Sequence, residues 1–262
     1  MAKFQCNFIS YTLKRAVDIT VVIPSVTIPE ALGMGQSNQQ LRHTKKDKYP
    51  VLYLLHGFGN NHATWTGYTN VELYAEEHNM AVVMLSAENK FYVNHDGGDL
   101  FFDFVSQELP DFVCGMFPVS DRKEDTYLAG LSMGGYGTLI HGLSNPDKYA
   151  ALGAFSVAVK LNFDMLDDMA KAGELDPLTI AKEQTKKGKS LPKLYIACGQ
   201  KDFLFEANVD FRDQMKALGA DVTWVEHPDY GHEWRFWDLQ VEAFLNWIER
   251  SDAYARRGKR QI

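Results

Sequence analysis

The chain has 262 residues, of which 45% are hydrophobic and 23% are charged, with a formal net charge of −7. This composition is that of a globular α/β protein, and the length suits one domain, so we expect residues 1–262 to form a single domain. The negative charge disfavours nucleic acid and anionic membrane surfaces as partners and favours a small neutral or modestly charged ligand. No run approaches the ~18 apolar residues of a membrane span, and the N-terminus lacks an apolar signal core, which predicts a cytoplasmic protein.

The three cysteines, Cys6, Cys114 and Cys198, lie far apart and form no Cys-x-x-Cys pair. This spacing predicts neither a disulfide framework nor a zinc site. We interpret the three side chains as free thiols in a reducing compartment.

The first part of the chain predicts a sheet edge followed by a buried strand. Residues 3–10 and 17–23 are two β-rich runs, which we interpret as an antiparallel hairpin. Residues 29–49, rich in Gly, Gln, Asn and Lys, are predicted to form a loop. Residues 50–55 form a continuous apolar run, which is typical of a parallel strand covered on both faces.

Beyond residue 55, helix-like and strand-like segments alternate, which indicates βαβ units. We therefore predict an α/β fold with an eight-stranded, mostly parallel sheet and helices on both faces. Pro110 is expected to bend one of the helices. The predicted helices cover 71–78, 100–117 and 133–143, and the remaining strands cover 80–85, 125–131, 150–159, 193–198 and 221–226.

Residues 160–191 interrupt this alternation and predict a small helical cap insertion. One short helix is expected to end at Gly173, and a second to begin at Asp176-Pro177 and end at Gly188. An insertion here would lie over the ends of the strands. An ordinary crossover made of two helices is the alternative.

A nucleophile elbow is predicted within residues 125–136, where an apolar strand runs through Gly130-Leu131-Ser132-Met133-Gly134 into a helix. The flanking glycines avoid collisions with neighbouring backbone at a sharp turn. The Ser132 hydroxyl would then lie at a helix N-terminus, where N–H groups and the helix dipole stabilise negative charge. The alternative is a glycine-rich turn with a capping serine.

A serine nucleophile needs a base within hydrogen-bond reach and an acid that orients the base. Asp202 directly follows the strand at 193–198, and His232 follows the strand at 221–226, which is the order that an α/β-hydrolase requires. We therefore predict a triad of Ser132, Asp202 and His232. The weaker candidates are Asp164, Asp167 and Asp168 in the predicted cap, Asp229 in a turn beside Pro228, and His56, for which a structural hydrogen bond is expected.

Two backbone N–H groups are needed to hold the developing oxyanion. We expect them from Met133, which follows the nucleophile, and from Phe58, in the loop after the strand at 50–55. Gly57 lets this loop turn its backbone towards the site. The side chain of Phe58 is then free to line the acyl pocket.

Four motifs together resemble the esterase D-like α/β-hydrolases, most closely the bacterial tributyrin esterases. The likeness covers residues 4–250. It implies the α/β-hydrolase fold, hydrolysis of short-chain acyl esters through an acyl-enzyme, the triad and oxyanion amides named above, no metal or organic cofactor, and a homo-oligomer. The motifs are Leu54-Leu55-His56-Gly57-Phe58, Gly130-Leu131-Ser132-Met133-Gly134-Gly135-Tyr136-Gly137, Gly199-Gln200-Lys201-Asp202-Phe203-Leu204 and His232-Glu233-Trp234.

Related activities remain open as alternatives. A cinnamoyl (feruloyl) or acetylxylan esterase comes first, and an S-formylglutathione hydrolase is less favoured because the loop at 58–62 lacks the cysteine usual in that branch. An acyltransferase would use the same acyl-enzyme, whereas a non-catalytic binding module would be expected to lose a triad residue. An aromatic pocket for a cinnamoyl group would be lined by Trp65, Phe91, Tyr92 and Trp234, although large aromatics at strand ends also pack in the core.

Overall fold

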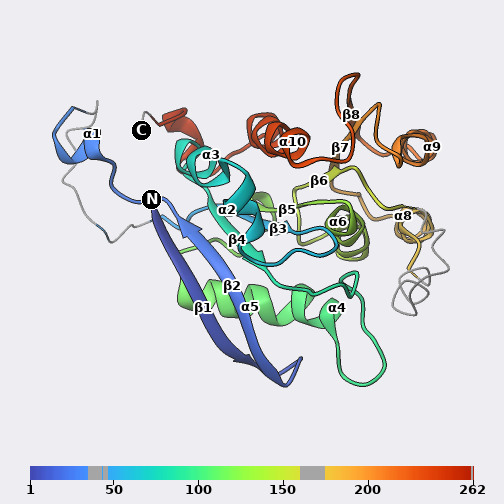
Figure 1. The fold of residues 1–262 in the computed structure, drawn as a ribbon, viewed down its shortest axis with the longest axis horizontal. Coiled ribbons are helices and arrows are strands. Elements are labelled where there is room, and N and C mark those ends of the chain that lie inside the picture. Colours follow the sequence, from blue (N-terminus) through green and yellow to red (C-terminus); the bar gives the residue numbers. More distant parts are fainter. Residues whose placement is uncertain (35–42, 44–46, 160–174, 261) are drawn as a thin grey trace.

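The computed structural model describes residues 1–34, 43, 47–159, 175–260 and 262. Its eight strands form one sheet in the order β1-β2-β4-β3-β5-β6-β7-β8 (Figure 1). The predicted eight-stranded, mostly parallel sheet is therefore confirmed. The strands are β1 (Ala2–Ser10), β2 (Arg15–Ile23), β3 (Val51–Leu55), β4 (Ala81–Leu85), β5 (Thr126–Leu131), β6 (Ala151–Phe155), β7 (Lys193–Gly199) and β8 (Val222–His227).

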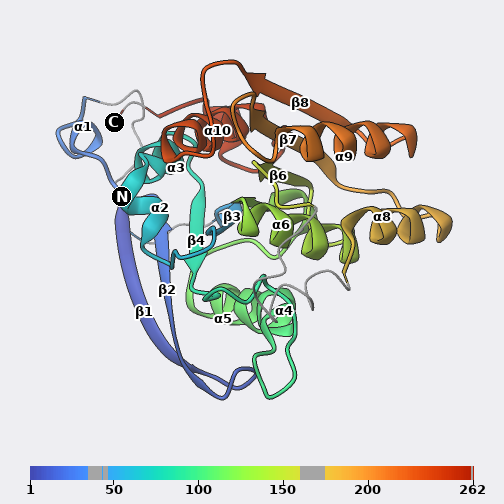
Figure 2. The same cartoon turned by 45° about the vertical axis from the view of Figure 1, so that its right-hand side comes forward.

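The predicted hairpin forms one edge of the sheet. β1 pairs antiparallel with β2, and β2 pairs antiparallel with β4, whereas β4, β3, β5, β6, β7 and β8 run parallel to one another. The hairpin reaches past the rest of the sheet and lies beside α5 (Leu109–Met116), as Figure 2 shows. The ring of Phe8 stacks on that of Phe112 at 3.8 Å between centroids, which fixes the hairpin to this helix.

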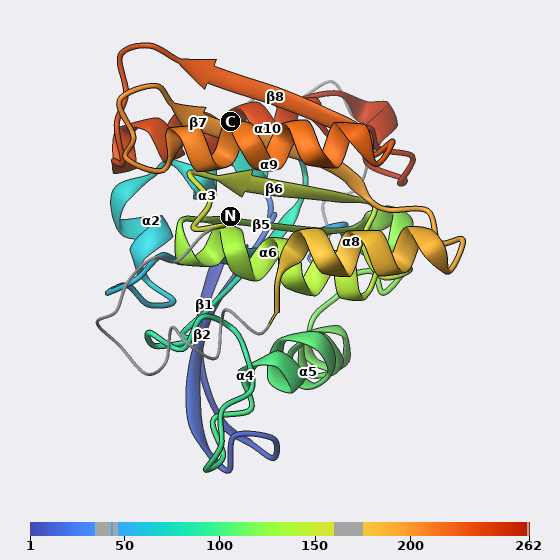
Figure 3. The ribbon, with the colours of Figure 1, turned by 90° about the vertical axis from the view of Figure 1, so that its right-hand side faces the viewer.

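Side chains of the parallel strands alternate between two hydrophobic cores, because successive residues of a strand point to opposite faces. In β3, Tyr53 and Leu55 join one core, and Leu52 and Leu54 join the other. Helices cover both faces, which explains the continuous apolar runs (Figure 3). One face carries α5, α6 (Met133–Ser144), α8 (Pro177–Lys186) and α9 (Phe205–Ala217), and the other carries α2 (Thr64–Tyr68), α3 (Val71–Glu77) and α10 (Trp234–Trp247).

The helix predicted over 100–117 is present but contains a π-helical turn. It consists of α4 (Phe101–Asp103), a π-helix at Phe104–Glu108 and α5. Pro110 has no N–H to donate to Ser106, and the Ser106 carbonyl accepts a hydrogen bond from Lys148 Nζ at 2.6 Å instead. The π-helical turn thus lies directly before the proline.

Two boundaries differ from the sequence prediction by more than two residues. β6 ends at Phe155 rather than continuing to residue 159, because Ser156 takes a φ of 46° and the N–H of Val157 donates to Asn208 Oδ1 at 2.9 Å instead of continuing the ladder. The predicted loop at 29–49 begins within a short helix, α1 (Ile28–Ala31). Helices of four or five residues, such as α1 and α2, carry too little periodicity to be predicted.

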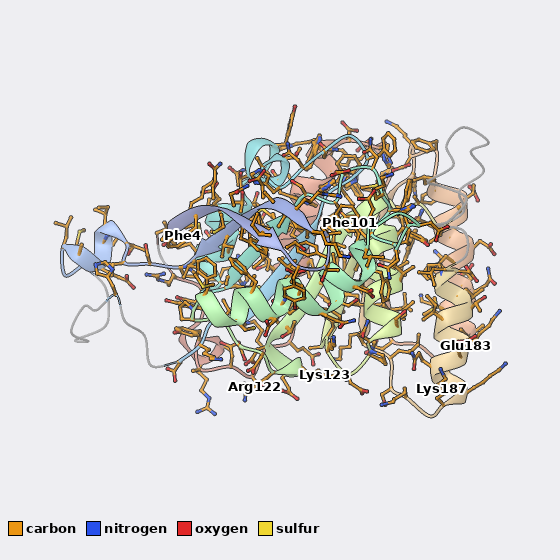
Figure 4. All side chains as sticks on the ribbon, turned by 90° about the horizontal axis from the view of Figure 1, so that it is seen from below. Phe4, Phe101, Arg122, Lys123, Glu183 and Lys187 are labelled. Atoms are coloured by element: carbon orange, nitrogen blue, oxygen red, sulfur yellow. The ribbon has the colours of Figure 1, made fainter. Side chains whose placement is uncertain are left out.

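The predicted cap lies partly outside the described residues, since 160–174 are not described. Its second helix is present as α8, and the N-cap residue Asp176 accepts a hydrogen bond from the N–H of Thr179. α8 packs beside α6 in the helix layer and turns Glu183 and Lys187 to its outward side (Figure 4). Among the described residues, no helix combines the length and the apolar composition that crossing a bilayer requires.

Candidate active site

Ser132 lies in a strained turn between β5 and α6. Its φ and ψ are 53° and −115°, a conformation that costs about 1–3 kcal/mol for a residue with a side chain. Its N–H donates to the carbonyl of Phe155 on β6 at 2.8 Å, which holds the turn against the sheet. The hydroxyl therefore lies at the carboxyl edge of the sheet and at the N-terminus of α6, as a nucleophile elbow requires.

The two glycines of the elbow are required by close backbone contacts. A Cβ on Gly130 would lie 2.4 Å from the carbonyl oxygen of Gly134. A Cβ on Gly134 would lie 2.4 Å from the carbonyl oxygen of Leu55, at the end of β3. Any side chain at either position would therefore separate β5, α6 and β3.

The three predicted triad residues form one hydrogen-bond chain. His232 Nε2 lies 3.1 Å from Ser132 Oγ, and His232 Nδ1 lies 2.9 Å from Asp202 Oδ2. Because a carboxylate only accepts, Nδ1 carries the proton, and the unprotonated Nε2 accepts from the serine hydroxyl. The arrangement prepares Nε2 to take the hydroxyl proton when Ser132 attacks.

Asp202 is held as a carboxylate although its side chain is buried. Burial raises the pKa of Asp202, but the hydrogen bond and charge of His232, the N–H of Leu204 at 2.9 Å and the Ser156 hydroxyl together lower the pKa further than burial raises it. The net pKa lies below the ordinary value of an aspartate. The carboxylate can therefore stabilise a cationic His232 during a reaction.

A tight turn places Phe58 beside the nucleophile. The N–H of Asn60 donates to the Gly57 carbonyl at 3.3 Å, and Gly59 takes a φ of +76°. A Cβ on Gly57 would lie 3.6 Å from Ser132 Cβ, so the turn runs directly along the elbow. Phe58 is the second residue of this turn. The hydrogen bond that closes the turn does not involve the N–H of Phe58.

The predicted pocket aromatics divide between core and surface. Trp65, Phe91 and Tyr92 are buried, as the core-packing alternative expects. Trp65 Nε1 donates to the Leu55 carbonyl at 3.1 Å, and the Tyr92 hydroxyl donates to the His56 carbonyl at 2.8 Å. These two rings thus fix the end of β3, against which α6 packs. Phe58 is 46% exposed, and Trp234 is half-buried, with its ring edge against Trp65 and its face on Tyr68.

Two aromatic rings contact the imidazole of His232, and sequence reasoning assigned neither a role. Trp237 of α10 meets it edge to face at 4.9 Å and 85°, and Phe203 lies 4.8 Å away. Phe203 is 70% exposed. Its place next to Asp202 in the sequence was a usable signal, whereas the contact of Trp237 arises only when α10 packs on the sheet.

Within the described ranges, the competing base and the competing acid have other partners. His56 is buried, with Nδ1 donating to the Gly57 carbonyl at 2.7 Å and Nε2 accepting from the N–H of Ala87 at 3.0 Å. Burial lowers the pKa of His56 to about 4, so it stays neutral in its structural role. Asp229 is exposed and lies 3.9 Å from Lys201 Nζ. The three predicted cap aspartates, Asp164, Asp167 and Asp168, lie outside the described residues.

One cavity lies away from the triad. A cavity of about 220 Å³ lies at the amino ends of β5 to β8, beside Tyr127, Lys193 and Thr223, and thus at the opposite edge of the sheet from Ser132. Within the described ranges, no group of three or more His, Cys, Asp and Glu side chains is placed to hold a metal ion.

Comparison with known proteins gives one consistent result. The family model described as "Putative esterase" matches residues 37–248. An acetyl esterase of Caldicellulosiruptor saccharolyticus is 29% identical over an alignment 273 residues long, and the alignment covers 95% of this chain and 99% of that protein.

Two solved structures from Staphylococcus aureus are similar over almost the whole chain. The fluorophosphonate-binding serine hydrolase FphF has a TM-score of 0.82 and 29% identity, and the match covers 94% of this chain and 98% of the FphF chain. The S-formylglutathione hydrolase FrmB has a TM-score of 0.81 and 28% identity, with the same coverage of 94% and 98%. With its elbow and eight-stranded sheet, the chain belongs to this esterase family and is a carboxylic ester hydrolase of the α/β-hydrolase fold.

Proposed function

We propose that the protein hydrolyses short-chain acyl esters through an acyl-enzyme formed on Ser132. The observation that carries this proposal is the hydrogen-bond chain from Ser132 through His232 to Asp202 at the carboxyl edge of the sheet. Each residue has the hydrogen-bond partner that its role needs.

Acylation begins with attack of Ser132 Oγ on the ester carbonyl carbon, while His232 Nε2 takes the hydroxyl proton. The carbonyl oxygen becomes an oxyanion, which the N–H groups of Met133 and Phe58 accommodate. Met133 is the first residue of α6, so its N–H has no acceptor within the helix and the helix dipole adds to the stabilisation. Asp202 stabilises the imidazolium that forms.

The C–O bond to the alcohol then breaks, and the departing alkoxide takes the proton from His232 Nε2. Water enters the same position, loses a proton to His232 and attacks the acyl carbon. The acyl–Ser132 bond then breaks, and His232 Nε2 returns its proton to the serine oxygen. The carboxylic acid is released and the resting hydrogen-bond chain is restored.

The place of Phe58 supports a preference for short acyl chains. Its backbone belongs to the turn along the elbow, and its ring is 46% exposed and 6.2 Å from that of the buried Phe91. We infer that this ring closes the acyl slot of a tributyrin esterase-like enzyme. The burial of Trp65, Phe91 and Tyr92 removes most of the aromatic wall that a cinnamoyl group would need, and so favours an aliphatic acyl group.

A panel of p-nitrophenyl esters from acetyl to dodecanoyl, together with methyl ferulate, tests the proposal. Each methylene buried in the slot contributes ~0.8 kcal/mol of binding energy. If this energy is also present in the transition state, it gives roughly a fourfold gain in kcat/KM. We expect kcat/KM to rise from acetyl to about butyryl and to fall at least tenfold by octanoyl, since overpacking typically costs ~1–3 kcal/mol. The Ser132→Ala variant supplies the background rate. A preference for dodecanoyl esters would contradict the short slot, and efficient cleavage of methyl ferulate would favour the cinnamoyl alternative.

A further inference from the structure

Ser156 is the first residue after β6, at the same edge of the sheet as Ser132. It is fully buried, and its φ of 46° is unusual for a residue other than glycine. Its N–H donates to the carbonyl of Ala197 on β7 at 2.7 Å, while the carbonyl of Phe155, just before it, accepts from the N–H of Ser132. The position of Ser156 is therefore fixed by strands on both sides.

The Ser156 hydroxyl is placed between α10 and the catalytic acid. Trp237 Nε1 donates to Ser156 Oγ at 3.1 Å, and the hydroxyl faces the Asp202 carboxylate, whose pKa it lowers. An indole N–H can only donate, so the hydroxyl accepts from Trp237 and its own proton remains available for the carboxylate. A hydrogen bond thus links α10 to Ser156, and the Ser156 hydroxyl lies beside the catalytic acid.

Trp237 also contacts the other member of the acid-base pair. Its ring meets the imidazole of His232 edge to face at 4.9 Å, and only 5% of the residue is exposed. One buried side chain therefore touches the base directly and reaches the acid through Ser156. Trp237 and Ser156 therefore connect His232 to Asp202 by a second route, in addition to the direct hydrogen bond between the two residues.

We propose that Ser156 and Trp237 are positioning residues that hold the Asp202–His232 pair in its reactive geometry. The inference rests on the proposed function, because it assigns a task within the same triad. The Ser156 hydroxyl fixes the orientation of the Asp202 carboxylate and withdraws part of its negative charge, and Trp237 fixes both the hydroxyl and the imidazole ring.

This proposal predicts a change in pH dependence. Without the Ser156 hydroxyl, the fuller charge on Asp202 stabilises the imidazolium of His232 more strongly. The acid limb of the kcat/KM profile should then move to higher pH. The titratable groups that face the Asp202 carboxylate are His232, from the loop before α10, and Cys198 of β7. Burial raises the pKa of the Cys198 thiol well above its ordinary value, so it stays neutral throughout the profile.

Ser156→Ala and Ser156→Gly test the role of the hydroxyl. Both variants remove the hydroxyl, but glycine also relaxes the strained φ, so a shared effect reports the hydrogen bond and not the backbone. We expect kcat to fall about 10- to 100-fold in both, as for loss of a hydrogen bond to a charged group, with KM changed by less than about threefold. The acid limb should move up in both.

Trp237→Phe tests the indole N–H, because phenylalanine keeps a ring against His232. We expect a smaller fall in kcat, about three- to tenfold, since Ser156 can still donate to Asp202. α10 supplies a matched control: Trp247 Nε1 donates to Thr223 Oγ1 at 3.1 Å, at the opposite edge of the sheet. Thr223→Val and Trp247→Phe remove the same type of hydrogen bond and should leave kcat and the pH profile unchanged.

The outcomes separate this inference from the proposed function. A fluorophosphonate probe labels an activated serine, so it should label the parent at Ser132 and leave Ser132→Ala unlabelled. If the parent is labelled but both Ser156 variants keep kcat within twofold and an unshifted acid limb, the positioning role is wrong. An equal effect in Thr223→Val would also overturn it. If the parent is not labelled and hydrolyses esters no faster than Ser132→Ala, the proposed function fails first.

Discussion

Gly134 lies directly against the carbonyl oxygen of Leu55, which a Cβ at position 134 would approach to 2.4 Å. This contact joins the start of α6 to the end of β3. It keeps the turn that follows β3, which contains Phe58, close to Ser132. The oxyanion donors that we propose thus depend on a glycine whose only role is to be small.

Gly134→Ala should therefore impair both folding stability and catalysis. We expect a loss of about 1–3 kcal/mol in the free energy of unfolding from overpacking, and a fall of roughly 10²-fold in kcat because the donors move apart. Chemical denaturation and ester kinetics measure the two effects. Gly67→Ala is the control, since a Cβ on this α2 glycine meets nothing within 4 Å, and it should leave both quantities near the parental values. Parental kcat in Gly134→Ala would contradict the role of this contact.

Ser132→Ala should abolish turnover while the protein stays folded. Only the hydroxyl is lost, because the turn is held by the backbone hydrogen bond from Ser132 N–H to Phe155. The loss is expected to be roughly 10⁶-fold in kcat, as in a well-studied serine hydrolase. Ester kinetics, with thermal unfolding as the check on folding, measure this. Activity within tenfold of the parent, in protein free of contaminating esterase, would exclude Ser132 as the nucleophile.

Asp202→Asn should cost on the order of 10⁴ in kcat, because an amide at this position no longer selects the Nδ1-protonated tautomer of His232. The matched control is Asp229→Asn, whose carboxylate is exposed and 3.9 Å from Lys201. We expect it to remain near the parental rate. A nearly silent Asp202→Asn beside a strongly impaired Asp229→Asn would mean that the acid is misassigned.

The free energy of unfolding should fall as the pH drops from 6.5 towards 4. Burial lowers the pKa of His56 and of His141 from 6.5 to about 4 in the folded protein. The unfolded chain therefore binds more protons in this window, and each histidine removes up to about 1.4 kcal/mol of stability per pH unit. Asp202, whose folded pKa is depressed below 3.8, adds a loss only at still lower pH.

Denaturation curves at successive pH values measure this slope. His141 donates to the Tyr92 carbonyl and accepts from Ser106 Oγ, both at 2.9 Å, so it is neutral in the folded state. His141→Gln should flatten the slope, whereas His43→Gln, at an exposed position, should not. A stability that is constant between pH 6.5 and 4 would show that neither buried histidine resists protonation.

Phe58→Ala should lengthen the acyl slot and move the preferred ester to longer chains. Removing the ring opens space beside Ser132 while the backbone N–H stays in its turn. We expect octanoyl esters to gain at least tenfold relative to butyryl esters, measured as kcat/KM. Phe203→Ala is the comparison, because its ring contacts His232 rather than the elbow turn, and the order of acyl preference should be kept. An unchanged chain-length profile in Phe58→Ala would remove the slot model and leave the triad untouched.

The sequence by itself determined the sheet and the elements that carry Ser132, Asp202 and His232. Continuous apolar runs and glycine spacing reflect local backbone geometry, which residues a few positions apart decide together. Since parallel strands end at the same edge, polar residues that follow β5, β7 and β8 were expected to meet there, and the structure brings them to 3.1 and 2.9 Å.

Only the tertiary structure decided which other side chains surround that edge. Trp65 and Tyr92 follow strands just as pocket residues do, yet both turn inward to hold carbonyls at the end of β3. Ser156 ends β6 early and reaches Trp237, which is 81 positions away in the sequence. Such contacts depend on how helices from distant parts of the chain pack on the sheet. Local sequence patterns do not predict that packing.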